Sequence, residues 1–197
     1  MPLPEPREIP IFPLNTVLFP GGFLPLRIFE QRYLEMTKAC LRDNSPFGAC
    51  LIREGREVGT PAIPCSIGCL ATIGEWDMPQ LGMFQLVARG GSRFHILQTR
   101  TPPSGLVVAD IELLPTAPDP VPVDTACRNV LESVIAKIGA DRFPAPIDLD
   151  NADWVTYRLA EILPLELPEK QALLEMDGAA QRFERLRRIL REHGAPV

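Results

Sequence analysis

The chain has 197 residues, of which 46% are hydrophobic and 23% charged, proportions that allow a buried core and argue against disorder. Its formal net charge of −5 argues against broad binding to a nucleic-acid backbone, which requires clustered lysine and arginine. No apolar run approaches the ~20 residues that span a bilayer, and charges and prolines interrupt the N-terminus, where a signal peptide is apolar. We therefore expect a cytoplasmic protein with no membrane or nucleic-acid partner.

The first part of the chain shows the short apolar runs of β-strands, interrupted by one helix. The helix is expected over about residues 30–42, where apolar side chains recur on a single face. Gly90 and Gly91 separate two apolar runs, and because glycine tolerates positive φ, the pair predicts a hairpin turn. The expected strands cover residues 9–14, 47–53, 68–78, 83–89, 92–100 and 106–114.

A proline-rich stretch, residues 115–122, predicts a linker, because proline fixes φ and removes a backbone donor. After it, the apolar period changes from that of strands to that of helices. The expected helices cover residues 126–138, with Asp124 or Thr125 as the cap, then 151–163, 168–176 and a last helix opened by Asp177. The fold class is therefore α+β, a β-rich part over residues 1–117 followed by a helical part over residues 118–197.

A catalytic nucleophile and base would have to use His95 or His193, and neither lies in a recognisable motif. Cys65 and Cys69 are four apart without a second pair of zinc ligands, so we interpret Cys69 as a small buried strand residue. Neither glycine pair is followed by the lysine and hydroxyl residue of a phosphate loop. The five cysteines lack the spacing of a disulfide scaffold, as expected in the cytosol. We therefore expect no enzyme activity, no catalytic residue, no metal site and no cofactor.

Two turn-like segments, residues 19–23 and 76–83, combine glycine or proline with large apolar side chains. Aromatic residues and methionine are enriched in binding surfaces because they bury large areas and adapt in shape. We expect partner contacts there; the alternative is that the second segment folds back on the strands as part of a core. The arginines of the last helix are interpreted as a solvated face, with a patch for an acidic partner or RNA as the alternative. The candidate binding residues are Phe19, Phe23, Trp76, Met78 and Met83.

Four motifs carry a resemblance to a known family. They are IFPLNTVLFP (residues 11–20) with LPLRIFEQRY (24–33), IGCLATI (67–73), GGSRF (90–94) and KQALLE (170–175) with Arg182. With the motifs in this order, the chain resembles the N-terminal substrate-binding domain of Lon proteases over about residues 9–193. Cys69 departs from the family, which commonly has threonine at this strand position.

The resemblance implies a PUA-like β pseudo-barrel followed by a helical bundle. It also implies recognition of polypeptide substrates and, in full-length Lon, help in hexamer assembly. Catalysis is not implied, because the ATPase and Ser–Lys protease parts are missing from the chain given. The expected partners are unfolded or partly folded polypeptides, with a Lon protease as a further candidate. A PUA-like barrel leaves RNA binding as the alternative, against which the acidic composition counts. The oligomeric state stays open.

Overall fold

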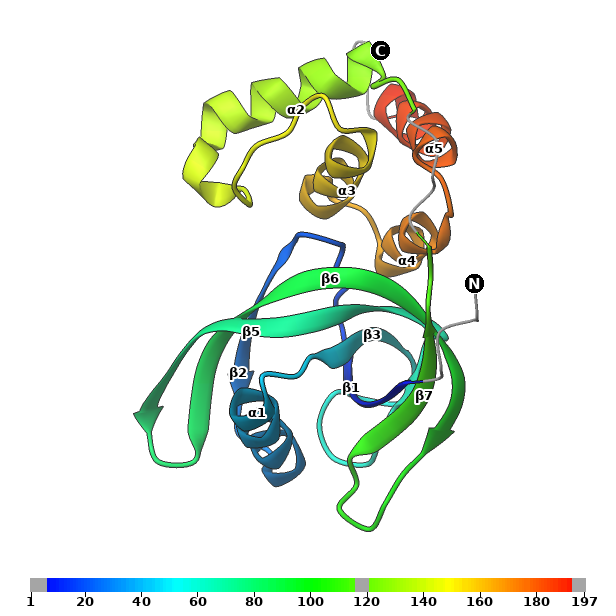
Figure 1. Cartoon of the computed structure of the whole chain (residues 1–197). Helices are drawn as coiled ribbons and strands as arrows, with labels where there is room; N and C mark the ends of the chain where they lie inside the picture. The colour runs from blue at the N-terminus through cyan, green and yellow to red at the C-terminus, as the bar shows by residue number, and fades with distance from the viewer. Residues whose placement is uncertain (1–6, 116–120, 193–197) are drawn as a thin grey trace. The chain divides into compact units, whose positions relative to one another are not determined.

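The computed structural model describes residues 7–115 and 121–192 and divides into two compact units between Leu114 and Pro115 (Figure 1). The predicted linker, residues 115–122, lies mostly outside the described residues. The described residues form seven strands, five α-helices and one 3-10 helix. The α+β class predicted from the sequence is confirmed.

The first unit is built around a ring of five strands. Its elements are β1 (Arg7–Leu14), β2 (Phe23–Ile28), α1 (Gln31–Asp43), β3 (Phe47–Glu54), β4 (Ile63–Pro64), β5 (Ile67–Gln80), β6 (Met83–Arg100) and β7 (Val107–Leu113). β1 pairs with β3 in parallel and with β7 antiparallel, so the order β1–β7–β6–β5–β3 closes on itself. β2 lies outside this ring and pairs with the first half of β6. Closure removes the free edges that an open sheet would expose.

Phe94 fills the inside of the ring, and two glycines make room for it. Its side chain is fully buried. A Cβ atom on Gly48 would lie 2.7 Å from Phe94 Cζ, and one on Gly68 would lie 2.8 Å from the same atom. Any side chain at either position would therefore displace the ring of Phe94. The buried residues around Phe94 are Ile9, Ile11, Cys50, Val107, Ala109 and Ile111.

The hairpin turn expected at Gly90 and Gly91 is wrong, because β6 runs unbroken through both glycines. Gly90 instead receives another segment at close range: its carbonyl accepts the Gly21 N–H at 2.8 Å, and its N–H donates to the Gly22 carbonyl at 2.9 Å. A Cβ atom on Gly90 would lie 2.2 Å from the Phe19 carbonyl oxygen. Glycine within a strand can mark a bulge or a close backbone approach as well as a turn, and here the register against β5 also shifts.

A second core lies between α1 and the face of the strands opposite the ring interior. α1 confirms the helix predicted over residues 30–42 to within one residue at each end. The rings of Phe12 and Tyr33 stack at 4.0 Å between centroids, which joins β1 to the helix. The other buried members from α1, β2 and the first half of β6 are Leu24, Ile28, Leu34, Met36, Cys40, Phe84, Leu86 and Ala88.

The second unit contains only helices among its described residues. They are α2 (Thr125–Ile138), the 3-10 helix η1 (Ala140–Arg142), α3 (Ala152–Ile162), α4 (Leu167–Glu175) and α5 (Ala179–Glu192). The four α-helices predicted in this unit are confirmed, and each predicted end lies within two residues of the observed end. Asp124 caps α2 by accepting the Cys127 N–H at 3.0 Å, and Asn151 caps α3 by accepting the Trp154 N–H at 3.0 Å. Within the described part of the chain, no helix is both long and apolar enough to cross a bilayer.

Arg182 corrects the interpretation of the last helix as a uniformly solvated arginine face. Its side chain is fully buried. The guanidinium donates from Nε to Thr156 Oγ1 at 3.0 Å and from Nη1 to the Met176 carbonyl at 2.9 Å, and it pairs with Asp153. It also lies over the ring of Tyr157, 4.3 Å from the centroid. The arginine pattern alone did not distinguish this tertiary anchor from the surface arginines beside it.

Candidate functional site

A small three-stranded sheet, which we call the arm (residues 23–28, 72–80 and 83–89), extends from the ring (Figure 1). β6 is long enough to pair with two strands along one edge, with β2 at residues 84–89 and with β7 at residues 94–100. β5 pairs with β3 only at residues 69–71, so its later residues run beside β6 alone among the described strands. The β5–β6 hairpin turns at Gly82, where φ is 83°.

A bulge at Gly74 decides which face of the arm each β5 side chain occupies. Ile73 stands opposite Ala88 and Glu75 stands opposite Val87, so β5 uses two residues where β6 uses one. Side chains alternate after the bulge, as they do in any strand. The arm therefore has an inner face, which packs against α1, and an outer face, which points away from α1.

Trp76 lies on the inner face of the arm. It stands opposite Leu86, and its ring meets that of Phe84 edge to face with 5.6 Å between centroids. Phe84 and Leu86 both belong to the core beneath α1. Trp76 nevertheless remains 53% exposed. Its indole is thus held on one side by the core and open on the other.

Phe19 does not take part in this surface, and the expectation that it contacts a partner is wrong. Its side chain is fully buried. The segment around it turns back onto β6, where Gly21 and Gly22 exchange backbone hydrogen bonds with Gly90. This docking fixes Phe19 in the interior.

The other four predicted binding residues lie on the arm. Trp76 and Met78 are exposed on β5, and Phe23 is 48% exposed at the start of β2, on the other side of β6. Met83 is half-buried, and its Sδ accepts a hydrogen bond from Arg27 Nη2 at 3.5 Å. The arm gathers these residues on one sheet but distributes them over its strands.

Several exposed apolar residues of this unit were not singled out from the sequence, and three of them are the most exposed. Leu81, at the hairpin tip, is 97% exposed, and Phe29 and Val58 are each more than half exposed. Leu81 had a sequence signal, since it is a large aliphatic residue directly before the turn glycine. Phe29 and Val58 had none, because their exposure depends on how β2, α1 and the loop between β3 and β4 pack together.

The outer face of the arm is hollowed into a groove of about 630 Å³. Pro25 and Arg27 of β2 lie on one side of it, Val87 of β6 lies in the middle, and Glu75 and Asp77 of β5 lie on the other side. Both carboxylates are exposed. The groove therefore combines an apolar centre with an acidic wall.

A smaller hollow of about 250 Å³ lies where β2 meets α1. Phe29 and Val58 are its exposed apolar residues, Tyr33 lies at its buried side, and Glu30 and Glu57 add carboxylates to its lining. Burial raises the pKa of Tyr33 to about 12, with Glu30 and Glu57 adding to the rise and Arg32 opposing it. The Tyr33 hydroxyl therefore stays neutral near pH 7.

The residues considered for chemistry lie apart from these hollows. His95 Nδ1 lies 3.1 Å from Glu112 Oε1 on the neighbouring strand, in an exposed pair, whereas His193 lies outside the described residues. Cys69 is buried, with its Sγ 3.3 Å from the Gly91 carbonyl oxygen, and Cys65 is half-buried. Across residues 7–115 and 121–192, no group of three or more histidine, cysteine or acidic side chains is arranged to hold a metal.

Residues 8–192 match the family described as the ATP-dependent protease La (LON) substrate-binding domain. The chain belongs to this family. A crystal structure of a Lon N-terminal domain protein from Xanthomonas campestris is 33% identical, with a TM-score of 0.76, over 91% of this chain and 96% of that one. The substrate-binding family and the Lon N-terminal fold predicted from the sequence are thus confirmed.

Longer relatives match only in part of their length. Lon protease 2 of Myxococcus xanthus is 29% identical over 127 residues, 64% of this chain and 14% of that protein. The Lon protease of Cytophaga hutchinsonii is 25% identical over 189 residues, 90% of this chain and 23% of that protein. The chain therefore spans less than a quarter of these two Lon proteases.

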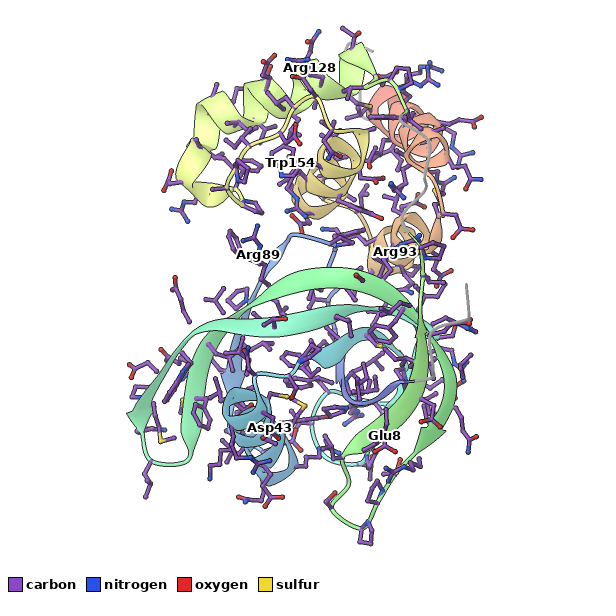
Figure 2. The ribbon with its side chains drawn as sticks, in the orientation of Figure 1. Glu8, Asp43, Arg89, Arg93, Arg128 and Trp154 are labelled. Carbon is purple, nitrogen blue, oxygen red and sulfur yellow. The ribbon has the colours of Figure 1, made fainter. Side chains whose placement is uncertain are left out.

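The motifs of this Lon-type domain have structural roles in the ring and around α1. In GGSRF, Gly90 admits the Phe19 carbonyl and Phe94 fills the ring, while Arg93 leaves the strand on the face opposite Phe94 (Figure 2). In FEQRY, Arg32 Nη1 donates to the Gly105 carbonyl at 3.2 Å. Arg32 also pairs with Glu30, 3.0 Å from Nη2 to Oε2. These motifs explain the scaffold, whereas the exposed residues Trp76, Met78 and Leu81 of the arm lie outside all four motifs.

Proposed function

We propose that this domain is a non-catalytic module that binds unfolded or partly folded polypeptides, and that the arm contacts them. The observation that carries the proposal is the exposure of Trp76, Met78 and Leu81 along one projecting hairpin. Soluble domains rarely expose a contiguous apolar surface without using it for binding. An unfolded chain offers the apolar side chains that such a surface can bury.

The family relationship supports the same proposal. The matching family is named for substrate binding, and the longer relatives are Lon proteases. We propose that a Lon protease is a partner of this domain and that both act in the cytoplasm. In that role the domain supplies recognition, while cleavage belongs to the protease.

The test is binding of a fluorescein-labelled model protein that has been reduced and carboxymethylated so that it cannot refold. Trp76→Ala should weaken the affinity more than tenfold, because a buried aromatic anchor contributes ~2 kcal/mol or more. Leu97→Ala is the matched control, since Leu97 is 49% exposed on β6 outside the arm. Equal affinities for the wild type and Trp76→Ala, with the thermal midpoint unchanged, would reject the arm as the binding surface.

A further inference from the structure

The groove and the hollow lie on either side of β2. Both are lined by Pro25, Leu26 and Arg27, so this strand is their common wall. The hollow, about 250 Å³, is of a size to take a single large side chain, whereas the groove, about 630 Å³, is longer and more open. A segment of extended polypeptide that crosses β2 would reach both.

The two depressions share an excess of negative charge. Glu30 and Glu57 line the hollow, and Glu75 and Asp77 line the groove, against the single lining cation Arg27. Arg32 offsets Glu30 from outside the hollow through their ion pair. Among the lining residues, Glu57, Glu75 and Asp77 then stand against Arg27 alone, so the two depressions favour a positively charged ligand.

The acidic wall of the groove has no cation of its own. Neither Glu75 nor Asp77 forms an ion pair with another described residue; Asp77 Oδ1 accepts the neighbouring Met78 N–H at 2.7 Å. The two side chains share the outer face two residues apart on β5, about 7 Å along the strand. Arg27, on the opposite wall, donates to Met83 Sδ at 3.5 Å.

This spacing matches that of an extended peptide. Alternate side chains of an extended chain also point to one side about 7 Å apart. A lysine or arginine between Glu75 and Asp77 would leave a neighbouring apolar side chain free to reach Val87 and Pro25, or the hollow beyond β2. The apolar contact supplies affinity, and the carboxylates supply selectivity.

We propose that the groove and hollow around β2 recognise extended polypeptide segments in which a large apolar residue stands close to lysine or arginine. The inference rests on the proposed polypeptide-binding function and names the class of segment that the domain selects. Acidic segments of equal hydropathy are disfavoured, because they place a carboxylate against Glu75 and Asp77. The selectivity is of the order expected for exposed ion pairs, about tenfold between oppositely charged segments, and it falls as salt rises.

The test uses three unstructured peptides of equal length with the same phenylalanines, alternating with lysine, glutamine or glutamate. Fluorescence anisotropy gives the dissociation constant of each peptide at low and high salt. The wild type should bind the lysine peptide about tenfold more tightly than the glutamate peptide. The double variant Glu75→Gln/Asp77→Asn should bind them within about twofold, with its affinity for the glutamine peptide unchanged.

The matched control is Glu54→Gln/Glu112→Gln, which removes two exposed carboxylates from β3 and β7 outside the arm. It should keep the preference for lysine. In a second variant, Phe29→Ser, all three peptides should bind more weakly by the same factor, because the hollow loses apolar surface.

Two results would overturn the inference and are distinguishable from each other. If the wild type binds all three peptides alike, or Glu75→Gln/Asp77→Asn keeps the preference, the charge selectivity is wrong and polypeptide binding stands. If neither the peptides nor the carboxymethylated protein bind, the proposed function itself is wrong.

Discussion

The two units of this domain differ in how deeply they bury charge and in where they expose large apolar side chains. The interior of the strand ring is apolar around Phe94, and the same unit leaves Trp76 and Leu81 open to solvent on its arm. Both units bury arginine, but Arg158 and Arg182 of the helical unit, at 1% and zero exposure, are buried more deeply than Arg32 of the strand unit, at 7%. Buried charge fixes how the helices are held together, whereas exposed apolar surface in the strand unit is available for recognition. In the proposed function, the exposed apolar residues of the strand unit bind the polypeptide, and the buried arginines hold the helices together.

The largest expected effect comes from Arg182→Met. The substitution keeps most of the side-chain volume but leaves Asp153, Thr156 and the Met176 carbonyl without their donor. We expect the free energy of unfolding of the helical unit to fall by about 3–5 kcal/mol, as when one partner of a buried pair is removed. Urea unfolding followed by Trp154 fluorescence in a Trp76→Phe background measures it, because these are the chain's two tryptophans.

Arg188→Met is the control for that change. Arg188 is exposed on the same helix, and its pairing with Glu192, 3.9 Å from Nε to Oε1, is a surface contact. Its loss should change the free energy of unfolding by less than about 0.5 kcal/mol. Equal effects of the two substitutions would show that burial of Arg182 does not organise the unit.

In the strand unit, Gly90→Ala tests the close approach of the Phe19 segment. A Cβ atom there meets a backbone carbonyl, which cannot move aside as a flexible side chain can. We expect a loss of about 2–3 kcal/mol in the free energy of unfolding. Gly91→Ala is the matched neighbour, since its Cβ would lie 3.5 Å from the nearest atom and should be tolerated. If both variants unfold at the same urea concentration, the contact does not hold the segment in place.

Glu161 on α3 should make the stability of the helical unit depend on pH. Burial raises the pKa of Glu161 from 4.5 to about 7, although Arg158 and Lys170 both act to lower it. The folded state therefore binds this proton more tightly than the unfolded chain does. Because of this group, the free energy of unfolding falls as pH rises from about 4.5 to about 7.

Glu161→Gln removes this dependence because glutamine cannot ionise. Above pH 7 the variant should exceed the wild type by up to about 3 kcal/mol, and the difference should vanish below about pH 4.5. Urea midpoints across this pH range provide the measurement. A variant that is less stable than the wild type at pH 8 would mean that the ion pair with Arg158, 3.0 Å from Nη2 to Oε1, outweighs the cost of burial.

Apart from the control variants, the smallest expected effect on stability is that of Trp76→Ala. Its ring contributes one edge-to-face contact with Phe84 and is otherwise half exposed. We expect a loss of about 1 kcal/mol or less, so that the thermal midpoint stays nearly unchanged. A sharp fall in the midpoint in calorimetry would place Trp76 functionally in the core and would remove the main support for the arm as a binding surface.

Local signals predicted the helices well. Asp124 and Asn151 cap α2 and α3 as their side chains suggest, and the apolar face of α1 is buried as its spacing indicates. The same signals were ambiguous at Gly90, because a glycine that permits a turn also permits close packing of two backbones. The candidate site was predicted in part: Trp76 and Met78 are exposed as expected, whereas Phe19 is not.

The sequence by itself determined the family, the α+β class and the bounds of most elements, since these depend on motifs and on apolar periods that repeat over a few residues. Tertiary structure alone decided that Phe19 is buried, that Arg182 is an internal anchor and that Glu75 and Asp77 share one groove. Each depends on segments far apart in the chain meeting through closure of the ring, packing of α3 on α5, or the Gly74 bulge. No local pattern encodes such a meeting, because the partner that buries or exposes a side chain is supplied by another part of the fold.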